Sequence, residues 1–415
     1  MQSEWLPLSH AQRRLWLLDQ LDPGAPAYNL AWILRLRGEL EVEALRQSLG
    51  LVLQRHAPLR TVFGNIEGEP VQAVKSEVPV ELPVVDLSSV PRERRQDRAL
   101  ELAAEEGARP FHLETGPVIR FKLFRLDDQE HILVNTMHHI VTDGWSLQIF
   151  SRDLAAFYEA LIVGKQPDLP PLPVQYSDYV RAEHERLSGG ALERGLQFWK
   201  ETLKDAPPVL ELPADRPRPA IQTHKGRNVF FTLDAELTGA VKQMCRERGV
   251  TLFMVLLAAL DALLWRYTGA SEIVVGSASA GRTELEFEPL IGLFVNTVVL
   301  RAKVADDPTF SELLQRVRLG TLDTLAYQDI PFEAVVQELH PTRSMDNTPV
   351  FQVMFIVQNL PGGKLSLAGL ELQALDFDSG IAKFDLSLEV FEGETLFCRL
   401  EYNSDIFDRP RMERP

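Results

Sequence analysis

Hydrophobic and polar positions alternate with two different periods along the whole chain, which predicts a mixed α/β protein. Three segments of the first half have the strand pattern: 28–38, 117–126 and 131–136. Three others carry apolar residues at helical spacing: 41–56, 92–106 and 146–163. The second half repeats the mixture, with predicted helices at 234–248, 251–267 and 309–326 and predicted strands at 272–279, 293–301 and 350–358.

Proline-rich segments divide this pattern in the middle of the chain. Residues 164–175 hold four prolines, and a second such stretch covers 206–220, with a helical segment expected between them at 177–204. We therefore predict an N-terminal lobe at 1–165, a linker region at 166–214 and a C-terminal lobe at 215–415. The similar α/β character of the lobes indicates a duplicated fold, with the working site expected between the halves.

Charge and cysteine usage narrow the class of protein. The 415 residues carry a net charge of −16, which disfavours nucleic acid and anionic membranes as partners. The only cysteines, Cys245 and Cys398, fit reduced cytosolic thiols, and residues 1–20 lack a signal-peptide pattern. The longest apolar window, 252–265, is shorter than the roughly 20 residues of a membrane span. These features predict a cytoplasmic protein with no membrane partner.

The segment 137-MHHIVTDGWS-146 is the sharpest candidate for chemistry. His138 and His139 follow a predicted strand, so one side chain can face a cleft while the other faces packing. Histidine is suited to proton transfer near neutral pH, although paired histidines are often one core and one surface residue. Asp143 could fix the loop by a salt bridge or by capping the following helix, and Gly144 would let the backbone turn sharply.

Other kinds of site lack their signatures. The sequence has no HExxH motif, and the remaining histidines lack metal-ligand spacing, so we expect no metal. It also has no GxGxxG, GxxxxGK[ST] or GxSxG motif. We therefore expect the chain to bind no cofactor of its own.

The histidine motif resembles the HHxxxDG signature of the condensation-domain superfamily, the amide-forming domains of nonribosomal peptide synthetases. Further family motifs occur in the expected order, and the resemblance spans about residues 7–408. They are 9-SHAQRRLWLLDQL-21, 55-RHAPLRTVF-63, the YxDY segment with Tyr176, Asp178 and Tyr179, 291-IGLFVNTVVLR-301, 328-QDIPFE-333 and 349-PVFQVMF-355.

The resemblance implies a fold and a set of residue roles. It implies two chloramphenicol-acetyltransferase-like lobes in a V-shaped pseudo-dimer with a tunnel between them. His139 would position or deprotonate the acceptor amine, and a backbone N–H such as that of Gly144 could hold the developing oxyanion. His138 would be structural, and Asp143 would pair with Arg282 from the second lobe.

Three further residues are assigned to the substrate tunnel by the resemblance: Asn296, Trp145 and Ser146. Asn296 could hydrogen-bond substrate or backbone, or it could simply cap a strand end. Trp145 and Ser146 also suit packing and capping at a helix start.

As an expectation, the chain is a bacterial condensation domain of secondary metabolism that joins a carrier-bound amine to a carrier-bound donor thioester. Phosphopantetheine arms of donor and acceptor peptidyl carrier proteins would deliver both substrates, with an adenylation domain adjacent. The segment 12-QRRLWLLDQLDPGAPAYN-29 resembles the subtype that accepts an L-configured donor. Alternatives are a starter domain with a fatty-acyl donor, which the short segment before the first motif would suit, an epimerisation domain, and a non-enzymatic recruiting module. Heterocyclisation domains are disfavoured because they replace the histidines with aspartate.

Overall fold

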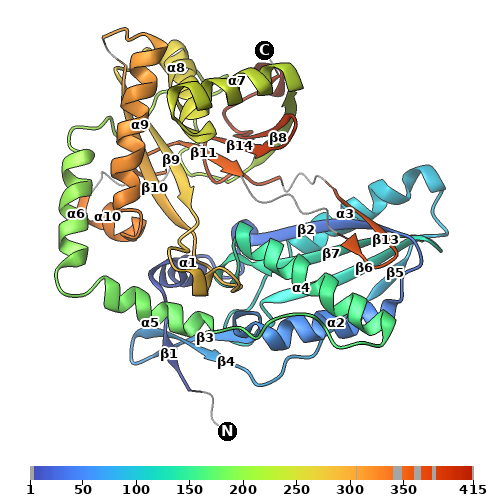
Figure 1. The fold of residues 1–415 in the computed structure, drawn as a ribbon. Coiled ribbons are helices and arrows are strands. Elements are labelled where there is room, and N and C mark those ends of the chain that lie inside the picture. Colours follow the sequence, from blue (N-terminus) through green and yellow to red (C-terminus); the bar gives the residue numbers. More distant parts are fainter. Residues whose placement is uncertain (1–3, 305, 340–347, 359–365, 376–379, 414–415) are drawn as a thin grey trace. The chain divides into compact units, whose positions relative to one another are not determined.

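The computed structural model describes residues 4–304, 306–339, 348–358, 366–375 and 380–413. These residues form two α/β units (Figure 1). Unit 1 holds the described residues up to 186 together with 282–294 and 366–375, and unit 2 holds the others. The mixed α/β class predicted from the sequence is confirmed.

Unit 1 contains a six-stranded sheet with the order β12-β13-β2-β7-β6-β5 and a three-stranded sheet with the order β1-β4-β3. Its helices are α1 (His10–Leu21), α2 (Val42–Arg55), α3 (Arg95–Gly107), α4 (Gly144–Val163) and α5 (Tyr176–Arg186). Its strands are β1 (Leu6–Pro7), β2 (Asn29–Arg37), β3 (Thr61–Ile66), β4 (Glu69–Val74), β5 (Val84–Asp86), β6 (Ile119–Asp127), β7 (Glu130–His138), β12 (Ser366–Leu367) and β13 (Leu370–Ala374).

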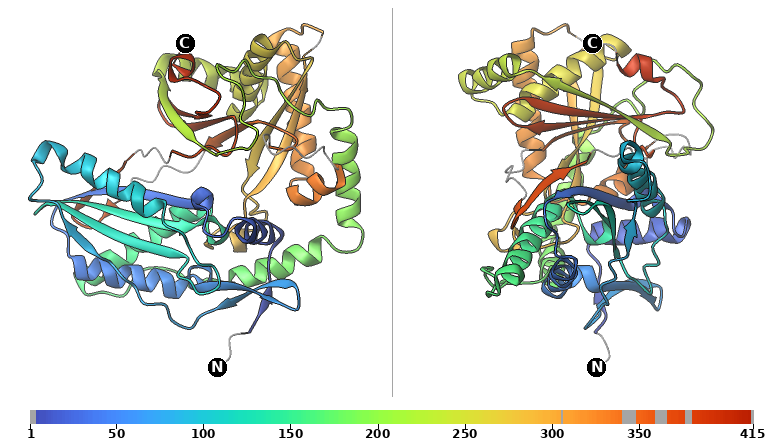
Figure 2. Two further views of the ribbon diagram at one scale, coloured as in Figure 1. Left: turned by 180° about the vertical axis from the view of Figure 1, so that it is seen from behind. Right: turned by 90° about the vertical axis from the view of Figure 1, so that its right-hand side faces the viewer.

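Helices cover both faces of the larger sheet of unit 1 (Figures 1 and 2). Alternate residues of β6 point to opposite faces, as a strand requires. Phe124 packs in the cluster that holds Ala99 and Ala103 of α3, whereas Phe121 stacks on Phe150 of α4 with ring centroids 6.3 Å apart. The neighbouring strand β7 is buried on both faces, and three consecutive apolar residues, 132–134, lie at its centre.

Unit 2 contains one six-stranded sheet with the order β10-β9-β11-β14-β15-β8. Its helices are α6 (Ala191–Thr202), α7 (Ala235–Arg248), α8 (Leu252–Thr268), α9 (Phe310–Ala326), α10 (Phe332–Leu339) and α11 (Arg409–Met412). Its strands are β8 (Gly226–Leu233), β9 (Glu272–Ser279), β10 (Asn296–Lys303), β11 (Val353–Gln358), β14 (Leu386–Glu392) and β15 (Leu396–Asn403).

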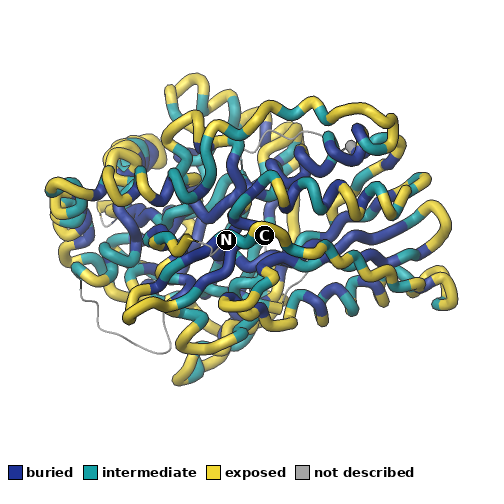
Figure 3. Tube along the Cα trace, turned by 90° about the horizontal axis from the view of Figure 1, so that it is seen from below, coloured by how far each residue is buried: buried dark blue, intermediate teal, exposed yellow. Residues whose placement is uncertain are grey.

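The central strand β9 of the unit 2 sheet is largely buried, whereas the edge strand β8 exposes Phe230 and Phe231. Figure 3 shows the buried and exposed residues along the described chain. Val275 of β9 packs in one core cluster with Leu257 of α8 and Leu313 of α9. Val274, the preceding residue, packs in the other cluster with residues of α6 and α10. The period of two along β9 therefore separates two apolar layers.

The predicted division of the chain differs from the observed one. The helix expected at 177–204 is two helices, α5 and α6, because Gly189 and Gly190 between them have φ angles of 61° and 83°. The expected linker region at 166–214 is shared, with α5 in unit 1 and α6 in unit 2. Two segments of the second half also belong to unit 1: 282–294, and β12 with β13, which extends the sheet next to β2.

Two expectations about the chain as a whole concern cysteines and membrane spans. Cys245 and Cys398 are both described, and neither forms a disulfide. No single helix of the described ranges has the length and apolar composition of a membrane span, although the pair α7 and α8, bent by 108°, meets those two criteria together.

We expect Asp261→Asn to raise the melting temperature more at pH 8 than at pH 5. Asp261 is buried in α8, and burial raises its pKa well above the ordinary value of 3.8. A group with a raised folded pKa contributes stability that is fully present below its unfolded pKa. As the pH rises from the unfolded pKa toward the folded pKa, the free energy of unfolding falls by about 1.4 kcal/mol per pH unit. Thermal unfolding across this pH range measures the effect. The exposed Asp323→Asn serves as control, and an equal shift at both pH values would contradict the expectation.

Candidate active site

The HHIVTDG segment lies in unit 1 and joins the end of β7 to the start of α4. His138 is the last residue of β7, and His139–Val141 form a single 3-10 turn. Asp143 caps α4, since its Oδ1 accepts a hydrogen bond of 2.8 Å from the Ser146 N–H. A buried strand and a capped helix therefore hold the loop at both ends.

His139 is half-buried and held in a defined orientation. Its Nδ1 lies 2.7 Å from the carbonyl oxygen of Thr142, three residues along the same loop. Because a carbonyl oxygen can only accept, Nδ1 carries the hydrogen, and the neutral ring has its lone pair on Nε2. The loop thus fixes a tautomer whose Nε2 can accept a proton or a hydrogen bond.

His138 has the opposite arrangement and a packed environment. Its Nδ1 accepts a hydrogen bond of 3.2 Å from the Ile140 N–H, and its side chain is buried. The His138 ring meets the Phe111 ring edge-on, with centroids 6.0 Å apart. The Arg120 guanidinium lies over the same Phe111 ring, 3.8 Å from its centroid. These contacts support the structural role expected for His138.

Asp143 and Arg282 form a buried ion pair. The Arg282 Nη1 donates to Asp143 Oδ2 over 2.9 Å, and the side chains are only 1% and 3% exposed. Burial alone would raise the pKa of Asp143, but the charge of Arg282 and hydrogen bonds from Arg282 and Ser146 together hold that pKa below its ordinary value. The carboxylate is therefore ionised at neutral pH.

The segment 282–294 wraps the Asp143 carboxylate. The Phe294 N–H donates to Asp143 Oδ2 over 3.0 Å, and the Gly292 N–H donates to Ser146 Oγ over 3.1 Å. The Arg282 guanidinium also lies 3.9 Å above the Phe294 ring. The resemblance places Arg282 in the second lobe, but this segment belongs to unit 1, so the pair is internal to that unit.

An aromatic cluster supports this segment from α5. The Tyr176 ring meets the Phe294 ring edge-on at 5.0 Å, and its hydroxyl donates to the Leu293 carbonyl over 2.6 Å. That hydroxyl also lies 3.0 Å from Ser9 Oγ, at the start of α1. The sequence marks Tyr176 as a motif residue but indicates no role for it, because its partners are more than 100 residues away.

The residues assigned to the substrate tunnel differ in what they can contact. Ser146 is fully buried, and its hydroxyl lies within the Asp143 network, so it has no surface for substrate. Trp145 is half-buried and donates from Nε1 to the Glu288 carbonyl over 3.1 Å. Asn296 belongs to unit 2, and backbone groups occupy its amide: Nδ2 donates over 2.7 Å to both the Gln328 and Ile330 carbonyls.

Gly144 has a φ outside the left-handed region, so its backbone conformation does not require glycine. A Cβ at this position would meet nothing within 4 Å, and the residue is exposed. As the first residue of α4 it belongs to the turn whose N–H groups have no intrahelical acceptor. The position is therefore open to the approach of a substrate carbonyl.

We expect Asn296→Ala to lower the free energy of unfolding by about 1–3 kcal/mol, because buried backbone groups of the turn between α9 and α10 lose their partners. Chemical denaturation measures this loss. If Asn296 only caps the end of the strand, the folded variant keeps its activity. Lost activity with unchanged stability would instead establish a substrate contact.

The structure also brings together three residues that the sequence spacing did not connect. His10, Glu183 and His184 lie close together in unit 1, with possible ligand atoms within 4.8 Å of one another. The sequence spacing of His10 and His184 gives no indication of this proximity, because sequence separation does not measure distance in the fold.

Comparisons with known proteins identify the family. The family model for the condensation domain matches residues 2–415, and the chain belongs to this family. It is 46% identical over 412 residues to a linear gramicidin synthase of Brevibacillus parabrevis, covering 99% of this chain and 5% of that protein. It is 39% identical over 411 residues to phosphinothricin tripeptide synthetase of Streptomyces viridochromogenes, covering 99% and 38%. The chain is thus a condensation domain of the nonribosomal peptide synthetase type, and it spans a minor part of these relatives.

Solved structures agree with this assignment. The X-domain from teicoplanin biosynthesis superposes with a TM-score of 0.88 at 30% identity, covering 99% of this chain and 92% of that one. The first condensation domain of the calcium-dependent antibiotic synthetase gives 0.82 at 24% identity, covering 98% and 93%, and shows the fold alone. The expectation of a bacterial source has only partial support, because malpinin synthetase of the fungus Mortierella alpina is 42% identical over 410 residues, covering 99% of this chain and 5% of that protein.

Proposed function

We propose that this chain catalyses amide bond formation between two carrier-bound substrates. The acceptor α-amine attacks the carbonyl carbon of the donor thioester, the C–N bond forms, and the C–S bond breaks. The donor carrier leaves as a free thiol, and the amine nitrogen loses one proton. The observation that carries the proposal is the His139 ring, whose Nδ1 is held by Thr142 so that Nε2 can accept from the amine.

Each residue of the loop contributes to this reaction in a different way. His139 orients the amine or takes its proton, and orientation alone can supply a large part of the acceleration. The N–H of Gly144, the first residue of α4, would donate to the developing oxyanion. His138, Asp143 and Arg282 are positioning residues, since their contacts hold the loop and the segment 282–294.

The substrates and partners that we propose are those typical of the family. Phosphopantetheine arms of a donor and an acceptor peptidyl carrier protein deliver the thioesters, and an adenylation domain adjacent in the same synthetase loads an amino acid. The domain holds no cofactor itself and works in the cytoplasm.

The test is intact mass spectrometry of an aminoacyl acceptor carrier after incubation with the chain and a loaded donor carrier. We expect the acceptor mass to rise by the donor acyl group, without ATP. An unchanged mass with inverted stereochemistry would indicate an epimerisation domain, and binding of carriers without either change would indicate a recruiting module. Product from free amino acids and ATP with the chain alone would overturn the proposal.

Donor choice is a finer part of the same proposal. The resemblance of residues 12–29 to the subtype with an L-configured donor supports an aminoacyl or peptidyl donor of that configuration. The same assay, with L-aminoacyl, D-aminoacyl and fatty-acyl donors in parallel, decides between them. Preference for the fatty-acyl thioester would establish a starter domain instead.

A further inference from the structure

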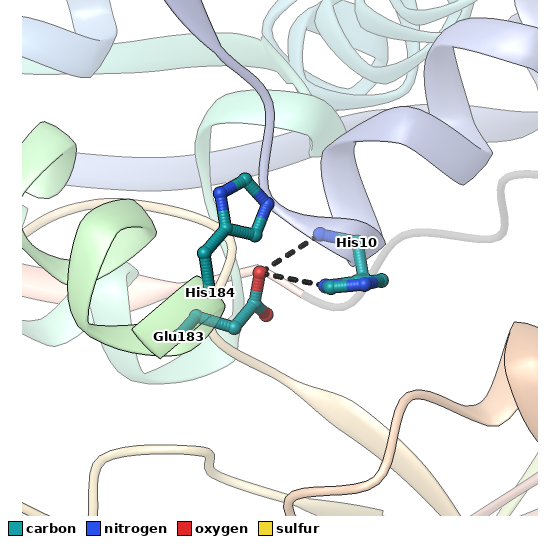
Figure 4. Close-up of side chains that lie close together, drawn as sticks. All are labelled: His10, Glu183 and His184. Atoms are coloured by element: carbon teal, nitrogen blue, oxygen red, sulfur yellow. Dashed lines mark hydrogen bonds and ion pairs between the residues drawn. The ribbon is translucent and has the colours of Figure 1, made fainter. Parts of the chain in front are cut away.

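The cluster of His10, Glu183 and His184 lies outside the HHIVTDG loop and has no part in the proposed reaction. His10 is the first residue of α1, and the other two residues lie in the last turn of α5. Both imidazole rings lie beside the Glu183 carboxylate (Figure 4). Two histidines and one carboxylate form the donor set of many zinc sites, with a further position for water.

The fold already holds two members of this cluster, the buried Glu183 and the half-buried His10, in contact. Glu183 is 6% exposed, and its Oε2 lies 3.0 Å from both the backbone N and Nδ1 of His10. Its Oε1 accepts from the Tyr179 hydroxyl over 3.3 Å. Ligands of a tetrahedral zinc ion lie about 3.3 Å apart when the bonds are about 2.0 Å long. The Glu183–His10 spacing is therefore close to that of two ligands on one ion.

The third ligand completes the cluster from the solvent side. His184 is exposed, and its ring centroid lies 5.5 Å from that of His10 with the rings nearly perpendicular. Its ring can therefore turn to present a nitrogen with little repacking, and water can reach the remaining coordination positions. Imidazole ligands favour zinc and related transition ions, whereas Mg²⁺ and Ca²⁺ take oxygen ligands.

We propose that His10, Glu183 and His184 bind one divalent transition-metal ion, for which Zn²⁺ is the probe. The ion joins the first turn of α1 to the last turn of α5, across residues 173 positions apart in the sequence. These same helices meet through Ser9 and Tyr176, whose hydroxyl reaches the Leu293 carbonyl next to the Asp143 network. Metal binding therefore stabilises the part of unit 1 that supports the loop of His139.

The experiment uses the untagged 415-residue chain, stripped with EDTA and titrated with ZnCl₂ by calorimetry, with bound metal counted by mass spectrometry after desalting. We expect one Zn²⁺ per chain and a rise in melting temperature of about 2–4 °C, because an ion that binds only the folded state stabilises it. EDTA should reverse the rise, and MgCl₂ should not produce it.

Matched variants connect the ion to these residues. His184→Ala should weaken Zn²⁺ binding at least about tenfold, since even residues that only orient a ligand contribute that much. This residue is exposed, so the variant should fold, and the equally exposed His112→Ala should bind as the wild type does. The proposal is overturned if the wild type binds no Zn²⁺, if His184→Ala binds it equally well, or if MgCl₂ gives the same shift. None of these readouts depends on amide formation.

Discussion

Replacing His139 by alanine should lower the rate of amide formation by about 10²–10⁴-fold while leaving the fold intact. The half-buried ring is held through a hydrogen bond from Nδ1 to the Thr142 carbonyl, within its own loop, so its removal disturbs little packing. It does remove the Nε2 atom that would accept from the acceptor amine. Single-turnover assays with loaded donor and acceptor carriers measure the rate.

A second variant separates proton transfer from positioning. Glutamine at position 139 keeps an amide that can hydrogen-bond the amine, but it cannot take up a proton at neutral pH. A slow His139→Gln with unchanged substrate binding therefore supports the base role, whereas near wild-type turnover would leave only positioning. His112→Ala, at an exposed position of the same unit, should react normally, and near wild-type turnover of His139→Ala would contradict any catalytic role.

The sequence pattern could predict the loop of the site because its signals are local. A buried strand, two adjacent histidines and a capping aspartate lie within a few residues of one another. The two histidines differ in environment as expected, because His138 packs beside Phe111 while His139 is half-buried. The cause is not alternation along one strand, because β7 ends at His138 and His139 begins the 3-10 turn. Local pattern could not reveal Phe111 itself, which lies in the irregular segment between α3 and β6.

The boundaries of the units could not be predicted, because they depend on contacts between segments distant in the sequence. The proline-rich stretches are real breaks in helical pattern, but the chain returns to unit 1 with 282–294 and with β13, which pairs with β2. Nothing in the composition of these segments distinguishes them from their neighbours. The contact between His10 and Glu183 could not be predicted for the same reason, since only the fold brings α1 beside α5.

The ion pair of Asp143 and Arg282 should give the second large effect, on stability. Removing either partner leaves an uncompensated buried charge, so Asp143→Ala and Arg282→Ala should each lower the free energy of unfolding by about 3–5 kcal/mol. The pKa of Asp143 lies below its ordinary value, so its contribution is present above the unfolded pKa and is lost as the pH falls through the folded pKa. Denaturation is therefore measured at pH 7.

The double variant distinguishes a direct pair from two separate defects. If the residues act on each other, Asp143→Ala with Arg282→Ala should destabilise much less than the sum of the single changes, because neither charge is then left alone in the core. Asp306 and Arg316 form a comparable pair on the surface, with an oxygen–nitrogen distance of 2.6 Å, and the same cycle there should give little destabilisation. Additive losses at Asp143 and Arg282 would contradict the pairing. If only Asp143→Ala were destabilising, the stabilising contribution of the carboxylate would come from accepting the Ser146 and Phe294 N–H groups, and not from its contact with the guanidinium.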